Sequence, residues 1–398
     1  MTENNRNGFR TVKEPDMREY KQKIREHRLK ILRRTTVFVT ILLMLIIGTW
    51  LFLTLRHYDA YEVTSTLERS DTEATRYEQF QENILKYSND GAIYTDWNNE
   101  LIWNQAYEMS DPQIDICDDY LVIYDKRGML IHIFTAAGLQ GSIETTMPID
   151  QVCVASQGTV AVLMRKDADG YLALYDRKGK NLAQGEIHGE KTGYPVAIAL
   201  SQDAIKLGVS MLDINDGKVK STVVFYNYGS VGQNEIDRIV GVTTFDDMVI
   251  PEIEFVANDK MVAFGDSEIL IFEGAQKPQL KQEIPLEKEV KSIFSNEEYI
   301  GIVTDNEDEA VTHRMTVYNT EGKTVMEKDF SMGYSNIEFL SNDEVCIRDT
   351  YACDIYTIRG TYKFHYEFDQ ELYKIIPGNS MLNYLFILSD ATESVRLK

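Results

Sequence analysis

The stretch Leu174-Tyr-Asp-Arg-Lys-Gly179 decides the fold, because altered copies of it recur along most of the chain. In each copy an alternating apolar segment ends in an aromatic residue, and a polar turn that usually contains glycine follows. The other copies are Ile133-Phe-Thr-Ala-Ala-Gly138, Phe225-Tyr-Asn-Tyr-Gly229, Ile271-Phe-Glu-Gly274, Val317-Tyr-Asn-Thr-Glu-Gly322, Ile355-Tyr-Thr-Ile-Arg-Gly360 and the degenerate Tyr94-Thr-Asp-Trp-Asn-Asn99. Equivalent positions in these copies, from 95 to 356, are on average about 43.5 residues apart.

This repeat predicts an all-β fold. Tight turns between antiparallel strands need a positive φ angle, which glycine and asparagine tolerate best. A period of 40–45 residues with several short strands in each repeat is typical of β-propeller blades. The segments between the copies alternate with period two and are rich in Val, Ile, Tyr and Thr, which disfavours horseshoe and helical repeats.

The number of blades follows from the last copy. One further period after position 356 reaches about residue 399, and the 398-residue chain ends in a strand-like run, Glu393–Lys398. We interpret this run as the third strand of an eighth blade. Its missing outer strand is expected from Glu62–Glu68, which would close the ring and protect the edges of the sheets. We predict eight blades, with seven as the alternative.

A membrane helix is predicted ahead of the propeller. Residues 36–55 are 20 uncharged residues, long enough as a helix to cross the roughly 30 Å hydrocarbon core. The basic run from Arg18 to Arg34 outweighs Arg56 on the other side, so the N-terminus is expected in the cytoplasm. A cleaved signal peptide is the competing interpretation, but no small-residue cleavage site follows Leu55.

Three parts are therefore expected: a basic cytoplasmic tail over 1–35, a transmembrane helix over 36–55 and an extracytoplasmic propeller over 56–398. The basic run could also lie on anionic lipid as an amphipathic helix, or merely fix the orientation. The tail has 11 Lys and Arg against 5 Asp and Glu, whereas residues 56–398 have 30 against 58. Because a domain with this negative charge repels phosphate backbones, we exclude a nucleic-acid partner.

The four cysteines form neither a disulfide framework nor a zinc motif. Cys346 and Cys353 flank a predicted hairpin, and a turn centred on Asp349 and Thr350 would place them opposite each other. Two interpretations stay open: a cross-strand disulfide, or cysteines that serve as small buried hydrophobic residues.

The sequence resembles an uncharacterised family of Gram-positive bacterial membrane proteins, a domain of unknown function with an N-terminal helix and a propeller similar to WD-repeat and quinoprotein propellers. The residues that carry the resemblance are Tyr87-Ser-Asn-Asp-Gly91, Leu101-Ile-Trp-Asn104, Gly193-Tyr-Pro195 with Ala199-Leu-Ser201, Phe225-Tyr-Asn227 and Ala263-Phe-Gly-Asp266. The resemblance covers residues 60–380 and implies the fold and the location at the membrane. It assigns no functional residue.

No catalytic, cofactor-binding or metal-binding residue is predicted. The histidines lie in unrelated contexts, and His132 and His365 are expected to be partly buried strand residues. Three acidic segments could attract Ca²⁺ but lack the full spacing of its ligands, so we interpret them as solvated turns. These segments are Asp167–Gly170, Asp213–Gly217 and Asp305–Glu309. Of the three tryptophans, only Trp97 and Trp103 lie outside the membrane segment, too few for a quinone-binding propeller.

The predicted function is that of a membrane-anchored interaction scaffold without catalysis. Its partners would be an envelope protein or surface component and, through residues 36–55, the lipid bilayer. Its negative charge favours a basic or Ca²⁺-bridged partner. One alternative is a ligand sensor that signals through the transmembrane helix. Another is an extracellular propeller enzyme, a hydrolase or lyase with residues gathered from several blades.

Overall fold

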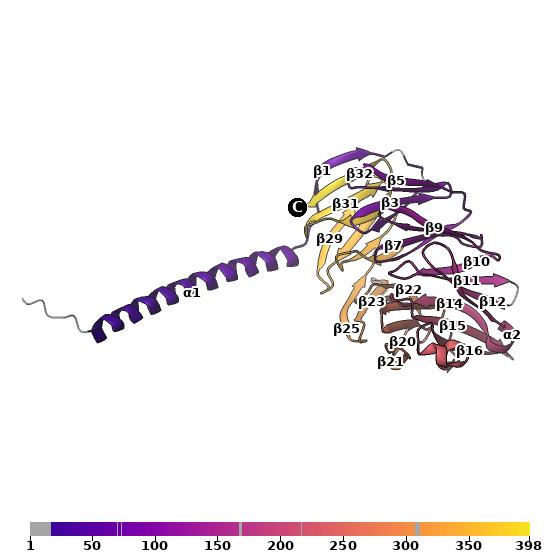
Figure 1. The fold of residues 1–398 in the computed structure, drawn as a ribbon. Coiled ribbons are helices and arrows are strands. Elements are labelled where there is room, and N and C mark those ends of the chain that lie inside the picture. Colours follow the sequence, from indigo (N-terminus) through magenta and orange to yellow (C-terminus); the bar gives the residue numbers. More distant parts are fainter. Residues whose placement is uncertain (1–16, 70, 73, 167–168, 216, 307–310) are drawn as a thin grey trace, which may run out of the picture. The chain divides into compact units, whose positions relative to one another are not determined.

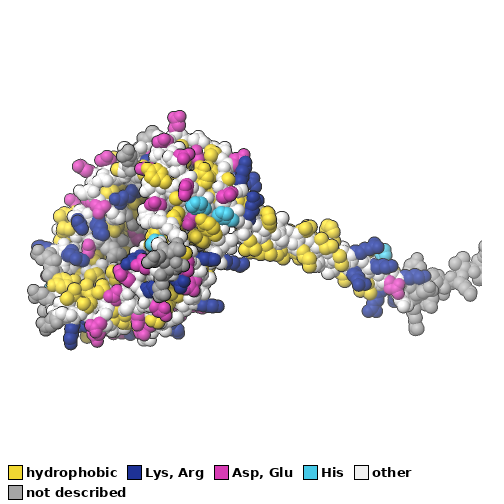
Figure 2. Space-filling view, turned by 180° about the vertical axis from the view of Figure 1, so that it is seen from behind, with side chains coloured by type: hydrophobic (Ala, Val, Ile, Leu, Met, Phe, Trp, Pro, Cys, Tyr) yellow, Lys and Arg dark blue, Asp and Glu magenta, His cyan; other side chains and the backbone are white. Residues whose placement is uncertain are grey.

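The computed structural model describes residues 17–398 except positions 70, 73, 167–168, 216 and 307–310. The chain divides after Arg56 into two units. The first contains the helix α1 (Met17–Leu55), and the second, His57–Lys398, is a β-propeller. Within the described residues, one helix is long and apolar enough to cross a membrane, over Lys21–Phe52. Figure 2 shows hydrophobic side chains along the middle of this helix and Lys and Arg side chains gathered toward its N-terminal part.

The described strands form eight antiparallel sheets of four strands, which are the blades of the propeller (Figure 1). The strands of blades 1 to 4 are β2 (Arg76–Phe80), β3 (Asn83–Ser88), β4 (Gly91–Thr95) and β5 (Leu101–Ala106); β6 (Pro112–Cys117), β7 (Tyr120–Asp125), β8 (Leu130–Thr135) and β9 (Gly138–Glu144); β10 (Ile149–Val154), β11 (Val160–Lys166), β12 (Asp169–Tyr175) and β13 (Asn181–Ile187); and β14 (Tyr194–Leu200), β15 (Lys206–Asn215), β16 (Lys218–Asn227) and β17 (Ile239–Asp246). The prediction of an all-β, eight-bladed propeller is confirmed, and the seven-bladed alternative is excluded.

The second half of the ring repeats the arrangement. The strands of blades 5 to 8 are β18 (Glu252–Ala257), β19 (Lys260–Phe264), β20 (Glu268–Glu273) and β21 (Gln279–Pro285); β22 (Val290–Ser295), β23 (Tyr299–Asp305), β24 (His313–Asn319) and β25 (Thr324–Phe330); β26 (Asn336–Phe339), β27 (Val345–Arg348), β28 (Ala352–Tyr356) and β29 (Tyr362–Glu367); and β30 (Leu372–Pro377), β31 (Asn383–Leu388), β32 (Ala391–Leu397) and β1 (Tyr61–Glu68). Three short helical elements lie around blade 4: α2 (Gly189–Thr192), η1 (Gly232–Asn234) and η2 (Ile236–Arg238).

Blade 8 closes the ring with strands from both ends of the chain. The N-terminal strand β1 pairs with β32 in register from Tyr61 opposite Leu397 to Glu68 opposite Ala391. In Figure 1 the indigo β1 lies beside the yellow β32. Both predictions for this blade are therefore confirmed: the C-terminal run is its third strand, and the segment Glu62–Glu68 supplies its outer strand.

The repeated aromatic position has a structural cause that the sequence does not reveal. In the first seven blades it lies at the end of the third strand, where the register between the third and fourth strands shifts by one residue. The turn that follows uses glycine at positive φ in four blades, for example Gly179 at 83° and Gly360 at 79°. Three of these aromatic residues, Phe134, Phe272 and Tyr356, are buried in the core.

The hydrophobic core is divided among the contacts between blades. Eight clusters of buried residues are present in the propeller, and each joins two neighbouring blades. The cluster between blades 8 and 1, which includes Tyr77, Ile84 and Leu385, completes the ring. Each blade is therefore stabilised from both sides, as the closed arrangement requires.

Cys346 and Cys353 do not lie directly opposite each other, and that prediction was wrong. Arg348 is the partner of Cys353 in the ladder, and Cys346 is opposite Ile355. The turn is centred one residue later than predicted, on Thr350 and Tyr351, because Asp349 lies opposite Ala352 and its amide donates to the Ala352 carbonyl. Both cysteines are free and buried in the core between blades 7 and 8, so the interpretation as small hydrophobic residues is confirmed.

The segment between α1 and β1 is part of the propeller core. Tyr58 is 2% exposed and belongs to the cluster between blades 7 and 8. Its amide donates to the carbonyl of Lys363 at 2.8 Å, and its carbonyl accepts from the amide of His365 at 3.3 Å. The first residues after the predicted membrane segment are thus fixed to blade 7 before β1 begins.

We expect Tyr58→Ala to lower the free energy of unfolding of the full-length protein by about 3–5 kcal/mol, because it leaves a cavity in this cluster. Urea denaturation in detergent, followed by circular dichroism, measures the change. Tyr351→Ala is the control, because Tyr351 is 50% exposed and should give a change below about 1 kcal/mol. Equal midpoints for the two variants would contradict the role of Tyr58.

Candidate functional site

The innermost strand of each blade lines the central channel. The first strands of neighbouring blades contact one another, as between β2 and β30, β6 and β10, and β22 and β26. Successive side chains of a strand point to opposite faces of its sheet. Charged residues within these first strands therefore stand out as candidates for function.

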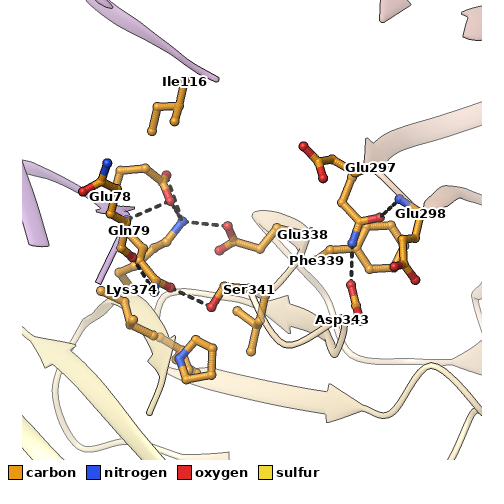
Figure 3. Close-up of a pocket in the computed structure, with 16 residues that line it drawn as sticks. Glu78, Gln79, Ile116, Glu297, Glu298, Glu338, Phe339, Ser341, Asp343 and Lys374 are labelled. Atoms are coloured by element: carbon orange, nitrogen blue, oxygen red, sulfur yellow. Dashed lines mark hydrogen bonds and ion pairs between the residues drawn. The ribbon is translucent and has the colours of Figure 1, made fainter. Parts of the chain in front are cut away.

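A cavity of about 570 Å³ opens at one end of the channel, lined by residues of blades 1, 2, 6, 7 and 8. Figure 3 shows its polar side chains. Its charged lining consists of five carboxylates and one lysine: Glu78, Glu297, Glu298, Glu338, Asp343 and Lys374. The mouth of the channel is therefore acidic, in keeping with the negative charge of the whole domain.

Lys374 of β30 is held between two of these carboxylates. Its Nζ lies 2.8 Å from Oε1 of Glu78 and 2.6 Å from Oε2 of Glu338, so blade 8 is ion-paired to blades 1 and 7. Burial alone would lower the pKa of Lys374, but the two carboxylates outweigh it and raise the pKa well above its ordinary value. Lys374 is therefore charged and is shared by two carboxylates.

Hydrogen bonds join the turns that follow the first strands at this end of the channel, and one of these bonds ends on Gln79 of β2. The bonds are Gln81 Nε2 to Asp119 Oδ1 (2.7 Å), Ser156 Oγ to the Gln202 carbonyl (2.8 Å), Asn258 Nδ2 to Asp203 Oδ2 (2.8 Å), Gln202 Nε2 to Glu297 Oε1 (2.9 Å), Asn296 Nδ2 to Asp343 Oδ1 (2.9 Å) and Ser341 Oγ to Gln79 Oε1 (2.8 Å). Two of them pass over an intervening blade, from blade 4 to blade 6 and from blade 7 to blade 1. The acidic mouth thus has a preorganised rim.

Further carboxylates lie on the first strands of other blades. Asp115 of β6 accepts a hydrogen bond from the Val154 amide of blade 3 at 2.6 Å. Burial raises its pKa to about 7; the Val154 amide opposes this rise, and the nearby Glu254 adds to it. Glu254 of β18 accepts a hydrogen bond from Ser295, and burial raises its pKa. Solvent still reaches part of both side chains, while surrounding protein disfavours their charged forms.

The two histidines considered from the sequence, His132 and His365, lie in different blades. His132 in β8 is buried, and its Nδ1 lies 2.8 Å from Ser142 Oγ. His365 in β29 is partly buried and pairs with Asp354 at 2.7 Å. Both are strand residues, as predicted. Of the acidic turns, Asp167, Asp216 and positions 307–309 lie outside the described residues.

Sequence reasoning missed the acidic channel. The available signal was a charged residue within the first strand of a repeat, such as Glu78, Asp115, Glu254 or Glu338. In the sequence such residues are interpreted as the solvent-exposed face of a strand, because the alternation of polar and apolar residues does not distinguish bulk solvent from a channel. The contact between blades 1 and 8 that pairs Glu78 with Lys374 spans 296 positions, and no local pattern reveals it.

We expect the stability of the protein to depend on the charge of Asp115. Because its pKa is raised to about 7 from an ordinary value near 3.8, the folded state binds more protons than the unfolded chain between these values. Stability conferred by the protonated group is therefore lost as the pH rises from about 4 to 7, by up to about 4 kcal/mol. Asp115→Asn imitates the protonated carboxyl and can still accept from Val154, so it should reduce this loss and raise the melting temperature at pH 8.

Thermal unfolding of the full-length protein between pH 4 and 8 measures the effect. The exposed Asp259 is the control, and Asp259→Asn should keep the dependence of the native sequence. Glu252 and Glu254, whose pKa values burial also raises, will retain part of the slope in Asp115→Asn. An unchanged slope in Asp115→Asn would refute the assignment.

Solved structures share the fold at low sequence identity. Sqt1 of Saccharomyces cerevisiae aligns with 86% of this chain and 100% of its own, at 10% identity and a TM-score of 0.53. BamB of Moraxella catarrhalis aligns over 85% and 100%, at 13% identity and a TM-score of 0.49. No curated protein matches the sequence. Residues 54–397 match DUF5711, and the chain therefore belongs to this family of unknown function.

Proposed function

We propose that this protein is a membrane-tethered, extracytoplasmic interaction module without catalytic activity. The acidic mouth of the channel would receive a cationic group of an envelope protein or surface component. The observation that carries this proposal is the excess of carboxylates around the cavity, five against a single lysine already shared by two of them. The β-propeller fold itself is typical of protein-interaction scaffolds, and this supports the proposal at the level of fold.

Electrostatics favour a cation at this position. Acidic side chains around a concave, low-dielectric opening focus the negative potential and attract positive groups. Glu297 and Glu298 are exposed at the rim and can meet a partner directly. A cavity of about 570 Å³ is large enough for a lysine or arginine side chain of a docking protein.

The hydrogen-bonded rim is suited to binding a partner without a large rearrangement of its turns. Because hydrogen bonds join the turns of seven blades, their carboxylates would lose little conformational freedom when a partner docks. The channel carboxylates Glu78 and Glu338 are organised around Lys374 as an ion pair. This arrangement suits the binding of a cationic group.

The tether comes from α1. Its apolar segment is long enough to span a bilayer, and the excess of Lys and Arg before it favours a cytoplasmic N-terminus. A retained anchor would hold the propeller at the outer surface of the membrane, where its strongly acidic character suits a basic partner.

We expect a membrane-impermeant maleimide to label Glu321→Cys in intact cells and to label Glu26→Cys only after permeabilisation, because Glu321 is an exposed propeller residue and Glu26 lies on the basic side of α1. The native protein, with its cysteines buried or half-buried, gives the background. Labelling of both variants in intact cells would contradict the proposed anchor, as would release of the propeller from the membrane fraction.

A photocrosslinking residue placed at Glu298 should capture a specific partner in intact cells, because this side chain lies at the acidic rim. The same residue at Glu327, exposed on the outer strand β25, is the control and should not capture it. Glu297→Gln combined with Asp343→Asn should reduce capture at position 298 at least severalfold by removing two rim charges. Equal capture at both positions, or no effect of removing the charges, would contradict docking at the mouth.

A further inference from the structure

At blade 3, Asp169 lies close to Glu186 and His188, and all three side chains are of types that can bind a metal ion. Asp169 begins β12, Glu186 lies near the end of β13, and His188 follows that strand. The ladder sets Tyr171 opposite Glu186 and Gly170 opposite Ile187, so all three residues meet at one end of the hairpin. One ligand atom from each lies within 4.8 Å of the other two.

The distances are those of a site that closes around an ion with small movements. His188 Nδ1 lies 3.7 Å from Asp169 Oδ1 and 3.7 Å from Glu186 Oε1, which is too long for a hydrogen bond. Donors bound to one tetrahedral Zn²⁺ at about 2.1 Å lie about 3.4 Å from each other. Because the three side chains are partly or largely exposed, shifts of a few tenths of an ångström are available to them.

Both carboxylates are oriented by neighbours outside the trio. The Tyr171 hydroxyl donates to Glu186 Oε1 at 2.9 Å, and the Gly189 amide donates to Asp169 Oδ1 at 3.3 Å. Hydrogen bonds of this kind fix the ligands of metal sites and are important for affinity. His188 is the ion-pair partner that the structure gives to both carboxylates, so a divalent ion would satisfy all three groups at once.

The site is open on one side, toward a cavity. Glu186 and His188 form part of the wall of a cavity of about 720 Å³ between blades 3 and 4. Its floor is largely apolar and includes Leu172, Met211 and Val224. An ion held by the trio would therefore have an entry path and a coordination position open to solvent or to a small ligand in the cavity.

We propose that Asp169, Glu186 and His188 bind a divalent transition-metal ion of the zinc type, with a free coordination position toward this cavity. An imidazole nitrogen with two carboxylates suits Zn²⁺, whereas Ca²⁺ takes six or more oxygen ligands and Mg²⁺ demands octahedral oxygen coordination. The site lies on an outer edge of blade 3, apart from the residues that line the channel mouth. It is therefore independent of the proposed docking function.

The test uses the full-length protein in detergent, purified through a tag without histidine and treated with chelator. Competition with a chromophoric chelator measures Zn²⁺ affinity, and the visible absorption of Co²⁺ reports its coordination. The native protein should bind one Zn²⁺ per chain, and His188→Ala and Glu186→Gln should each weaken binding at least about tenfold. His365→Gln is the matched control, because His365 pairs with a single carboxylate, Asp354, and should bind as the native protein does.

We expect circular dichroism to show that the variants fold, because the substituted side chains are exposed. No Zn²⁺ binding by the native protein would overturn the assignment, as would equal affinity in His188→Ala or a loss of binding in His365→Gln as large as that in His188→Ala.

Discussion

The pairing of β1 with β32 is the constraint on which the rest of the structure depends. A propeller ring leaves two unprotected sheets unless its first and last blades join, and open sheet edges invite wrong pairing. Here the outer strand of blade 8 comes from the N-terminal side of the ring and its other three strands from the C-terminal side. Closure also forms the core between blades 8 and 1 and brings Glu78 to Lys374, so the acidic channel exists only in the closed ring.

The channel combines groups that oppose folding with bonds that hold them in place. Burial disfavours the charged forms of Asp115 and Glu254, and neither gains a lysine or arginine as its described hydrogen-bond partner. Charges that weaken a fold are more often found at sites of function than elsewhere. The Val154 amide holds Asp115 and Ser295 holds Glu254, while Lys374 holds Glu78 and Glu338 together despite their repulsion. This balance is our reason for treating the channel as the functional surface and the aromatic turns as framework.

The sequence predicted the architecture because each blade repeats the same local events. An alternating strand, an aromatic residue and a turn with positive φ can be read from neighbouring residues, and the repeat length then sets the blade number. Predictions from neighbouring residues failed where the register between strands determines which residues meet. Cys346 and Cys353 were misplaced because one hairpin turn is centred one residue later than predicted. The meeting of Asp169 with Glu186 and His188 depends on a ladder that cannot be read from spacing. The channel acids were missed because they come from strands far apart in the chain.

The closing strand also sets the order of events when the protein is made. β1 leaves the ribosome early, but its partner β32 follows more than 300 residues later, with Glu62 opposite Arg396. At about 5–20 residues per second, β1 waits on the order of tens of seconds for its partner. During that time seven blades can form in sequence, while β1 and the first sheet keep open edges. The ring is therefore completed only after β32 has been made, and this interval is when the chain most needs protection from aggregation.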